Sequence, residues 1–324
     1  MTDTQTATEP KLAHFPVTFF ASVMGMAGLT LATHMAEVSW GVPAALSVLL
    51  LLVTIGIFVA ISTFFALKWR RYRAHFLAEW NHPVKKAFFP AISISLLLIA
   101  TALAPHATGL ARGVWIVGAA LQAGLTLAVI SGWIGHNPFQ QLHISPAWFI
   151  PAVGNVVAPL AGVSLGFVEL SWLFFSAGLV FWLVLLVLVM NRLIFHDPLP
   201  GRLLPTLAIL IAPPAVGFLA WINLNGGEAD AFARILLNAA YVFAAIVAVQ
   251  APKIRTSPFA LSWWALSFPM AAMTVATFRF AAIAGSGFHA VLAAVFYAVL
   301  LIIMIILVAR TLKAIRAAEI CVPD

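Results

Sequence analysis

The sequence predicts an all-α integral membrane protein: ten transmembrane helices that form five helical hairpins in a quasi-fivefold ring around a central pore. Three observations predict this fold class. The 324 residues are 63% hydrophobic and only 8% charged, a composition that excludes a soluble domain. Ten apolar stretches of membrane-spanning length follow one another with short connections. Finally, prolines deep within these stretches occur only in alternate ones.

The ten stretches use up the chain, so we expect a single membrane domain over residues 1–324, with helices within 15–309 and polar tails at 1–14 and 310–324. The first tail leads directly into a full span, which is not the pattern of a cleavable signal peptide. The predicted segments are 15–34, 42–67, 87–104, 110–133, 146–167, 170–191, 203–224, 231–250, 258–282 and 288–309.

The prolines divide these segments into two kinds. Proline removes a backbone donor and bends a helix, and a freed carbonyl in a bilayer is tolerated only against protein or a water-filled cavity. The odd segments are therefore predicted to be kinked inner helices around the pore, and the even ones straight outer helices facing lipid. Any five hydrophobic hairpins look periodic in sequence, so periodicity alone does not indicate a ring. The restriction of deep prolines to the odd segments favours the ring. One kink per odd segment is assigned to Pro16, Pro90, Pro151, Pro213 and Pro269.

The basic residues predict the orientation. Of 17 Lys and Arg residues, all but Arg112, Arg234 and Arg279 lie at the termini or in loops after even segments. This distribution follows the positive-inside rule, so the net charge of +7 indicates membrane topology and not nucleic-acid binding. We expect a multi-pass membrane protein with both termini cytoplasmic. The longest loop, 68–86, is interpreted as a topology anchor near anionic lipid, with regulatory docking as the alternative.

The interior of the predicted bundle contains no acidic residue, and the nine histidines lie at segment ends or in loops. A cation channel normally needs carboxylates, a proton- or sodium-coupled carrier a buried carboxylate, and an intramembrane haem enzyme paired histidines. We therefore expect neither catalysis nor a metal or cofactor. The single intramembrane charge, Arg279, is either an interfacial snorkelling residue or a positive charge that raises the anion concentration at the outer mouth.

Three motifs carry a family resemblance: FPVTFF at 15–20, FIPAVGN at 149–155 and WWALSFPM at 263–270. With them the chain resembles the TehA-like tellurite-resistance and C4-dicarboxylate transporter (TDT) family, which includes the slow-type anion channels of plants. The resemblance extends over essentially the whole chain, and the chain looks like the bacterial TehA branch, which implies a location in the bacterial inner membrane.

The resemblance implies a homotrimer in which every protomer has its own pore. It also implies that a phenylalanine next to the kink of segment nine occludes that pore, and the matching residue is Phe268, directly before Pro269. A ring in a narrow apolar lumen stops ions by steric block and dewetting. The alternative is that Phe268 is an ordinary packed residue among 25 phenylalanines.

The predicted function is a passive, anion-selective channel for small monovalent anions such as chloride and nitrate, occluded by Phe268. A pore without fixed cations at its centre should favour large, weakly hydrated anions. The main alternative is a secondary transporter or uniporter of dicarboxylate, sulfite or tellurite-type oxyanions. An intramembrane redox enzyme would need paired histidines or other ligands in the core, and the sequence has none there. A purely structural protein would not explain the kinked inner helices that are rich in small residues.

Overall fold

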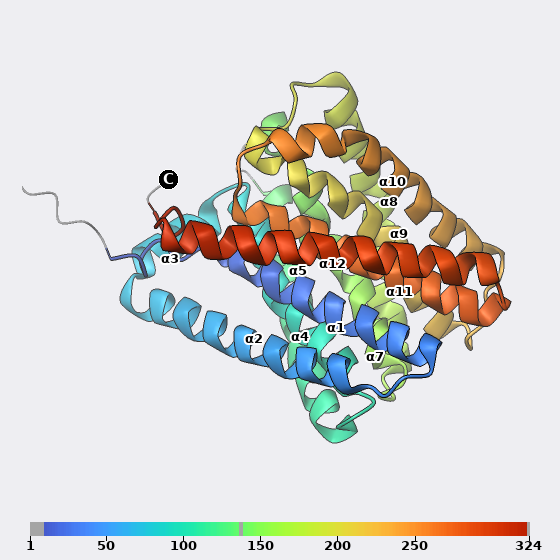
Figure 1. Ribbon diagram of the computed structural model, residues 1–324. Coiled ribbons are helices and arrows are strands. Elements are labelled where there is room, and N and C mark those ends of the chain that lie inside the picture. Colours follow the sequence, from blue (N-terminus) through green and yellow to red (C-terminus); the bar gives the residue numbers. More distant parts are fainter. Residues whose placement is uncertain (1–9, 136–138, 323–324) are drawn as a thin grey trace, which may run out of the picture.

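The computed structural model describes residues 10–135 and 139–322, and every regular element within them is a helix (Figure 1). Nine of the described helical spans are long and apolar enough to cross a membrane. The chain is therefore a multi-pass membrane protein. These spans are Val17–Trp40, Ala45–Arg71, Lys85–Leu103, Thr108–Ile134, Val168–Phe195, Gly201–Leu224, Ala231–Thr256, Leu261–Ala284 and Gly287–Arg316.

The predicted fifth segment, 146–167, is not one continuous helix. It is divided into η4 (Pro146–Trp148), α6 (Phe149–Val153), η5 (Gly154–Val157) and α7 (Pro159–Gly162). The cause lies in its composition, because each of its three prolines lacks a backbone donor and its glycines favour irregular backbone. Residues Pro146–Gly162 form only a shorter apolar helical stretch, so a tenth membrane crossing stays a prediction.

Side chains of the preceding helix, α5 (Thr108–Ile134), satisfy backbone carbonyls of this broken segment. The Pro151 carbonyl accepts hydrogen bonds from Thr126 Oγ1 (2.8 Å) and Gln122 Nε2 (3.3 Å). Trp115 Nε1 donates to the Ala158 carbonyl at 2.9 Å. Since an unsatisfied carbonyl is costly in a bilayer, these polar side chains explain how the segment can remain irregular inside the bundle.

The other odd segments change from 3₁₀ to α geometry near their prolines. They are η1 (Val17–Phe19) with α1 (Phe20–Trp40), η2 (Lys85–Phe88) with α4 (Ala91–Leu103), η6 (Gly201–Ile211) with α9 (Ala212–Leu224), and η7 (Leu261–Leu266) with α11 (Ser267–Ala284). Pro16 and Pro90 directly precede η1 and α4, and Pro213 and Pro269 lie in the first turns of α9 and α11. Proline costs little there, so bending at these residues stays a prediction.

The even segments are continuous α-helices: α2 (Ala45–Arg71), α5 (Thr108–Ile134), α8 (Val168–Phe195), α10 (Ala231–Thr256) and α12 (Gly287–Arg316). Only 22% to 39% of their apolar windows is buried, against 67% to 89% for the long odd segments. The odd segments thus form the interior and the even ones the periphery. One difference from the prediction is that α10 continues past residue 250 and includes Pro252.

Both described ends of the chain lie at the same end of the bundle (Figure 1), which we name the termini end; the opposite end is the distal end. The predicted loop 68–86 is partly helical here, because it contains α3 (Arg73–Asn81). Phe76 and Trp80, one helical turn apart, both pack edge-on against Phe89, at ring-centroid distances of 5.6 and 4.8 Å. This aromatic contact packs one face of α3 against the bundle, which the basic composition of the loop did not indicate.

A buried ion pair, which sequence reasoning missed, joins α2 to α3 at the termini end. Lys68 Nζ lies 2.6 Å from Glu79 Oε2, and both side chains are about 95% buried. Glu79 Oε1 also accepts the backbone N–H of Val17 at 2.8 Å, and Lys68 donates to the Phe15 carbonyl at 2.9 Å. The pair therefore connects the start of segment one to the α2–α3 region.

A close contact between α1 and α11 depends on a glycine. A Cβ atom at Gly25 would overlap the Ser267 hydroxyl and lie 2.8 Å from Ser267 Cβ. We expect Gly25→Ala to lower the free energy of unfolding by about 1–3 kcal/mol, the usual range for overpacking. Gly56→Ala is the control, because nothing lies within 4 Å of a Cβ there. Denaturant unfolding of the detergent-solubilised protein measures both, and equal stabilities would contradict the assigned packing.

Candidate functional site

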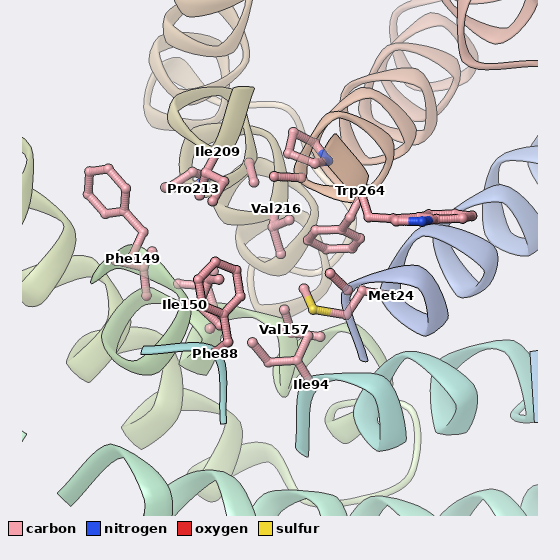
Figure 2. Close-up of a pocket in the computed structure, with 18 residues that line it drawn as sticks. Met24, Phe88, Ile94, Phe149, Ile150, Val157, Ile209, Pro213, Val216 and Trp264 are labelled. Carbon is pink, nitrogen blue, oxygen red and sulfur yellow. The ribbon is translucent and has the colours of Figure 1, made fainter. Parts of the chain in front are cut away.

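A small apolar cavity lies in the middle of the bundle, and all five odd segments contribute to it. Its volume is about 60 Å³. Figure 2 shows its lining side chains converging from separate helices on one space. Since apolar cavities stay dry, this part of the interior is a barrier to a hydrated ion. Representative lining residues are Met24 from α1, Ile94 from α4, Val157 from η5, Ile209 from η6 and Trp264 from η7.

A larger cavity of about 300 Å³, the distal cavity, follows toward the distal end. It is lined by α1, α4, α7, α9 and α11, and its polar residues are His34, Thr101, Asn223 and Arg279. Arg279 is half-buried, and within the described part of the chain its guanidinium has no hydrogen bond, ion pair or aromatic contact. An unpaired guanidinium in a cavity favours an anion.

Phe268 lines both the apolar cavity and the distal cavity. It is the second residue of α11, directly before Pro269, and its side chain is buried. Gly28 of α1 lies opposite: a Cβ atom there would be 3.4 Å from the Phe268 ring. Phe268 is thus located where the two cavities meet, together with Val216 of α9, which also lines both.

A third cavity, of about 750 Å³, lies at the termini end. Among its lining residues are Thr18 in segment one and Leu261 in segment nine, which come earlier in those segments than the residues that line the apolar cavity. Most of its charged residues are basic. Its acidic residues are Glu79, which is paired with Lys68, and Glu319. Burial raises the pKa of the Cys321 thiol in its wall, although Lys11 and Lys68 lower it. Its basic and histidine side chains are Lys68, Lys85, Arg202, His14, His75 and His82.

The three cavities follow one another along the inner segments. In segment one they are lined in turn by Thr18, then Ala21 and Met24, then Gly28 to Met35. No Asp or Glu of residues 10–135 and 139–322 lines the apolar or the distal cavity. A series of cavities with basic residues toward both ends and an apolar constriction between them is suited to passing anions and excluding cations.

The structure brings some of the sequence-predicted residues together and leaves others apart. Pro213 and Pro269 line the apolar cavity and Pro16 the cavity at the termini end, whereas Pro90 and Pro151 are buried outside the three.

Sequence reasoning missed the buried polar group around segment five. The polar i, i+4 pair of Gln122 and Thr126 in an otherwise apolar segment was the available signal. No cluster of three His, Cys, Asp or Glu side chains among the described residues could hold a metal ion.

Comparison with known proteins agrees with the motifs. The chain is 27% identical over 310 residues to the S-type anion channel SLAH3 of Arabidopsis thaliana, which is 94% of this chain and 49% of that protein. The tellurite resistance protein TehA homolog of Haemophilus influenzae is 27% identical over 260 residues, 80% of this chain and 79% of its own. An uncharacterized transporter of Methanocaldococcus jannaschii is 26% identical over 289 residues, 82% of this chain and 84% of its own.

The chain spans about half the length of the plant relatives SLAH3 and SLAH2, at 49% and 54%. The family described as SLAC1, voltage-dependent anion channel, matches residues 14–312, which is most of the chain. The resemblance indicated by the three sequence motifs is confirmed. The chain belongs to the SLAC1 voltage-dependent anion channel family.

Proposed function

We propose that this protein is an anion-selective channel that passes small monovalent anions, such as chloride and nitrate, through a pore within each protomer, and that Phe268 occludes this pore. The observation that carries the proposal is the position of Phe268 between the apolar and the distal cavity. Five odd segments contribute to each of these cavities, which supports a quasi-fivefold ring of five hairpins with proline-bent inner helices. Plant members of the family are named anion channels.

The charges along the pathway favour anions. Arg279 at the distal cavity and the basic residues at the termini end raise the local anion concentration at both mouths. The apolar cavity offers no carboxylate to replace the hydration shell of a cation, whereas the positive edge of an aromatic ring can face a passing anion. Without a fixed cation at the constriction, dehydration cost decides the selectivity, so nitrate and iodide pass more readily than fluoride.

The proposed setting is a homotrimer in a bacterial inner membrane, with the termini end facing the cytoplasm. The basic residues concentrated at the termini end support this orientation through the positive-inside rule. Large exposed apolar side chains on the even helices, such as Leu49, Val187 and Ile305, suit contact with lipid or with neighbouring protomers. Crosslinking of the protein in native membranes, followed by size analysis, tests for the trimer.

The alternative is a secondary transporter or uniporter of dicarboxylate, sulfite or tellurite-type oxyanions. The distal cavity favours it, because about 300 Å³ beside Arg279, His34 and Asn223 has room for a polyatomic anion. The name of the Haemophilus relative also refers to tellurite resistance. Saturable uptake of a polyatomic anion that depends on a proton gradient would support this carrier over the channel.

Reconstituted vesicles test the proposal directly. The purified protein is placed in liposomes with a chloride or nitrate gradient, and the reversal potential is compared with that under a potassium gradient. We expect the potential to follow the anion gradient, with nitrate more permeant than chloride and no requirement for a proton gradient. Clear cation preference would exclude an anion channel.

Arg279→Gln is expected to reduce anion flux at low salt by about three- to tenfold, because one positive charge no longer concentrates anions at the distal cavity. The measurement uses a Phe268→Ala background, in which the pathway is open. The difference should fade at high ionic strength, where exposed charges are screened. Arg112→Gln is the control, since Arg112 lies over the Phe167 ring and lines none of the three cavities. Equal losses in both variants would remove the assigned role of Arg279.

A further inference from the structure

Arg192, in the last turn of α8, is a buried cation without an adequate partner. Its exposed fraction is 1%. Nη1 donates to the Asp197 backbone carbonyl, but Nε and Nη2 have no hydrogen-bond partner. This carbonyl lies just beyond the helix end, and the bond to it occupies one of the five N–H donors of the guanidinium. A buried charge is strongly destabilising unless it is paired, so this side chain calls for an anion.

A cavity of about 370 Å³ lies at Arg192 and is separate from the proposed ion pathway, because it shares no residue with the other three cavities. Gln141 and His196 also line it, and both can donate hydrogen bonds to an anion. His196 Nε2 lies 3.3 Å from Asn191 Oδ1. The side chain of Asp197 is exposed and forms no ion pair with Arg192, so the guanidinium charge is not neutralised from within the described part of the chain.

The cavity borders an exposed apolar surface of the bundle. Ile194 and Phe195, two and three residues after Arg192 in sequence, are 62% and 73% exposed, and Phe195 also lines the cavity. Large apolar side chains in such exposed positions on a membrane helix are suited to contact with acyl chains. A ligand that places its charged group at Arg192 can therefore place an apolar tail along the end of α8.

We propose that Arg192, with Gln141 and His196, binds a phosphate group at the termini end of the bundle, and that a membrane phospholipid supplies it. The planar guanidinium matches the oxygens of a phosphate, and basic residues between membrane helices are suited to lipid headgroups. Free inorganic phosphate offers the same chemistry but gains nothing from the apolar surface of Ile194 and Phe195. The site does not depend on whether the pore conducts anions.

The experiment compares delipidated wild-type protein with Arg192→Gln in detergent, by native mass spectrometry and by thermal unfolding. Both proteins are titrated with phosphatidylglycerol, with inorganic phosphate and with diacylglycerol, which has the tails but no phosphate. We expect phosphatidylglycerol to bind and stabilise the wild type, and the apparent affinity to fall about tenfold or more in Arg192→Gln. Inorganic phosphate should act only weakly and diacylglycerol not at all.

Matched variants make the result specific. Arg255→Gln removes an exposed cation from the last turn of α10 and should leave lipid binding unchanged. Gln141→Ala, which keeps Arg192 intact, should weaken binding on its own, so the test remains decisive if Arg192→Gln folds poorly. Stabilisation by inorganic phosphate as strong as that by lipid would assign the site to free phosphate instead. Equal phosphatidylglycerol binding by wild type, Arg192→Gln and Gln141→Ala would overturn the proposal.

Discussion

Replacement of Phe268 by alanine is expected to raise chloride and nitrate flux through the protein at least about tenfold. The ring lies where the apolar cavity of about 60 Å³ meets the distal cavity of about 300 Å³, so in the proposed pathway its removal is expected to join the two cavities. Each tenfold gain in rate corresponds to about 1.4 kcal/mol of barrier. Anion efflux from proteoliposomes, measured side by side for the two proteins, gives the ratio.

The control for Phe268→Ala is Phe149→Ala. Phe149 is also buried and lines the apolar cavity, but it does not reach the distal cavity. Its loss should enlarge one cavity without connecting two, so flux should stay near the wild-type level. Potassium flux should remain low in both variants. Unchanged anion flux in Phe268→Ala, or an equal rise in Phe149→Ala, would return Phe268 to the role of an ordinary packed residue.

Glu79→Gln is expected to lower the free energy of unfolding by about 3–5 kcal/mol, the range for breaking a buried ion pair by removing one charge. The substitution leaves the Lys68 ammonium buried without a counter-ion, in contact with the Phe15 carbonyl and, at 5.9 Å from the centroid, the Phe65 ring. It also weakens the acceptor for the Val17 N–H at the start of segment one. Denaturant titration of the purified protein, followed by tryptophan fluorescence, measures the loss.

A second substitution separates the unpaired charge from the lost contact. The double variant Glu79→Gln with Lys68→Met removes both charges and should recover part of the stability, because no uncompensated ammonium remains. Glu228→Gln is the surface control, since Glu228 is exposed, and it should change stability by no more than about 0.5 kcal/mol. If the double variant is less stable than Glu79→Gln alone, the buried-charge explanation fails.

Composition and proline placement were sufficient to predict the class of this fold and much of its arrangement. Apolar length alone located nine spans, and the proline asymmetry separated the buried odd segments from the exposed even ones. The irregular backbone of segment five was harder to predict from the sequence. Its three prolines indicated disruption, but the hydrogen bonds from Gln122 and Thr126 that make it tolerable depend on tertiary contacts.

The candidate site was predictable only where a residue is chemically unusual or belongs to a motif. Arg279 is the charge that the sequence places inside segment nine, and Phe268 was identified through the WWALSFPM motif. Periodicity cannot indicate which face of α11 meets a cavity when the segment is buried on nearly all sides. The Lys68–Glu79 pair and the buried Arg192 were not foreseen, because basic residues after even segments satisfy the positive-inside rule whether or not they are buried.

The 3₁₀ stretches at the start of the inner segments have a consequence for how far each segment reaches. A 3₁₀-helix rises about 2.0 Å per residue and an α-helix about 1.5 Å. The 11 residues of η6 and the 13 of α9 therefore extend about 41 Å, while 26 α-helical residues in α10 extend about 39 Å. The inner segment, shorter in residues, is thus about as long in space as its outer neighbour, so the two helices of this hairpin can span the same thickness of bilayer.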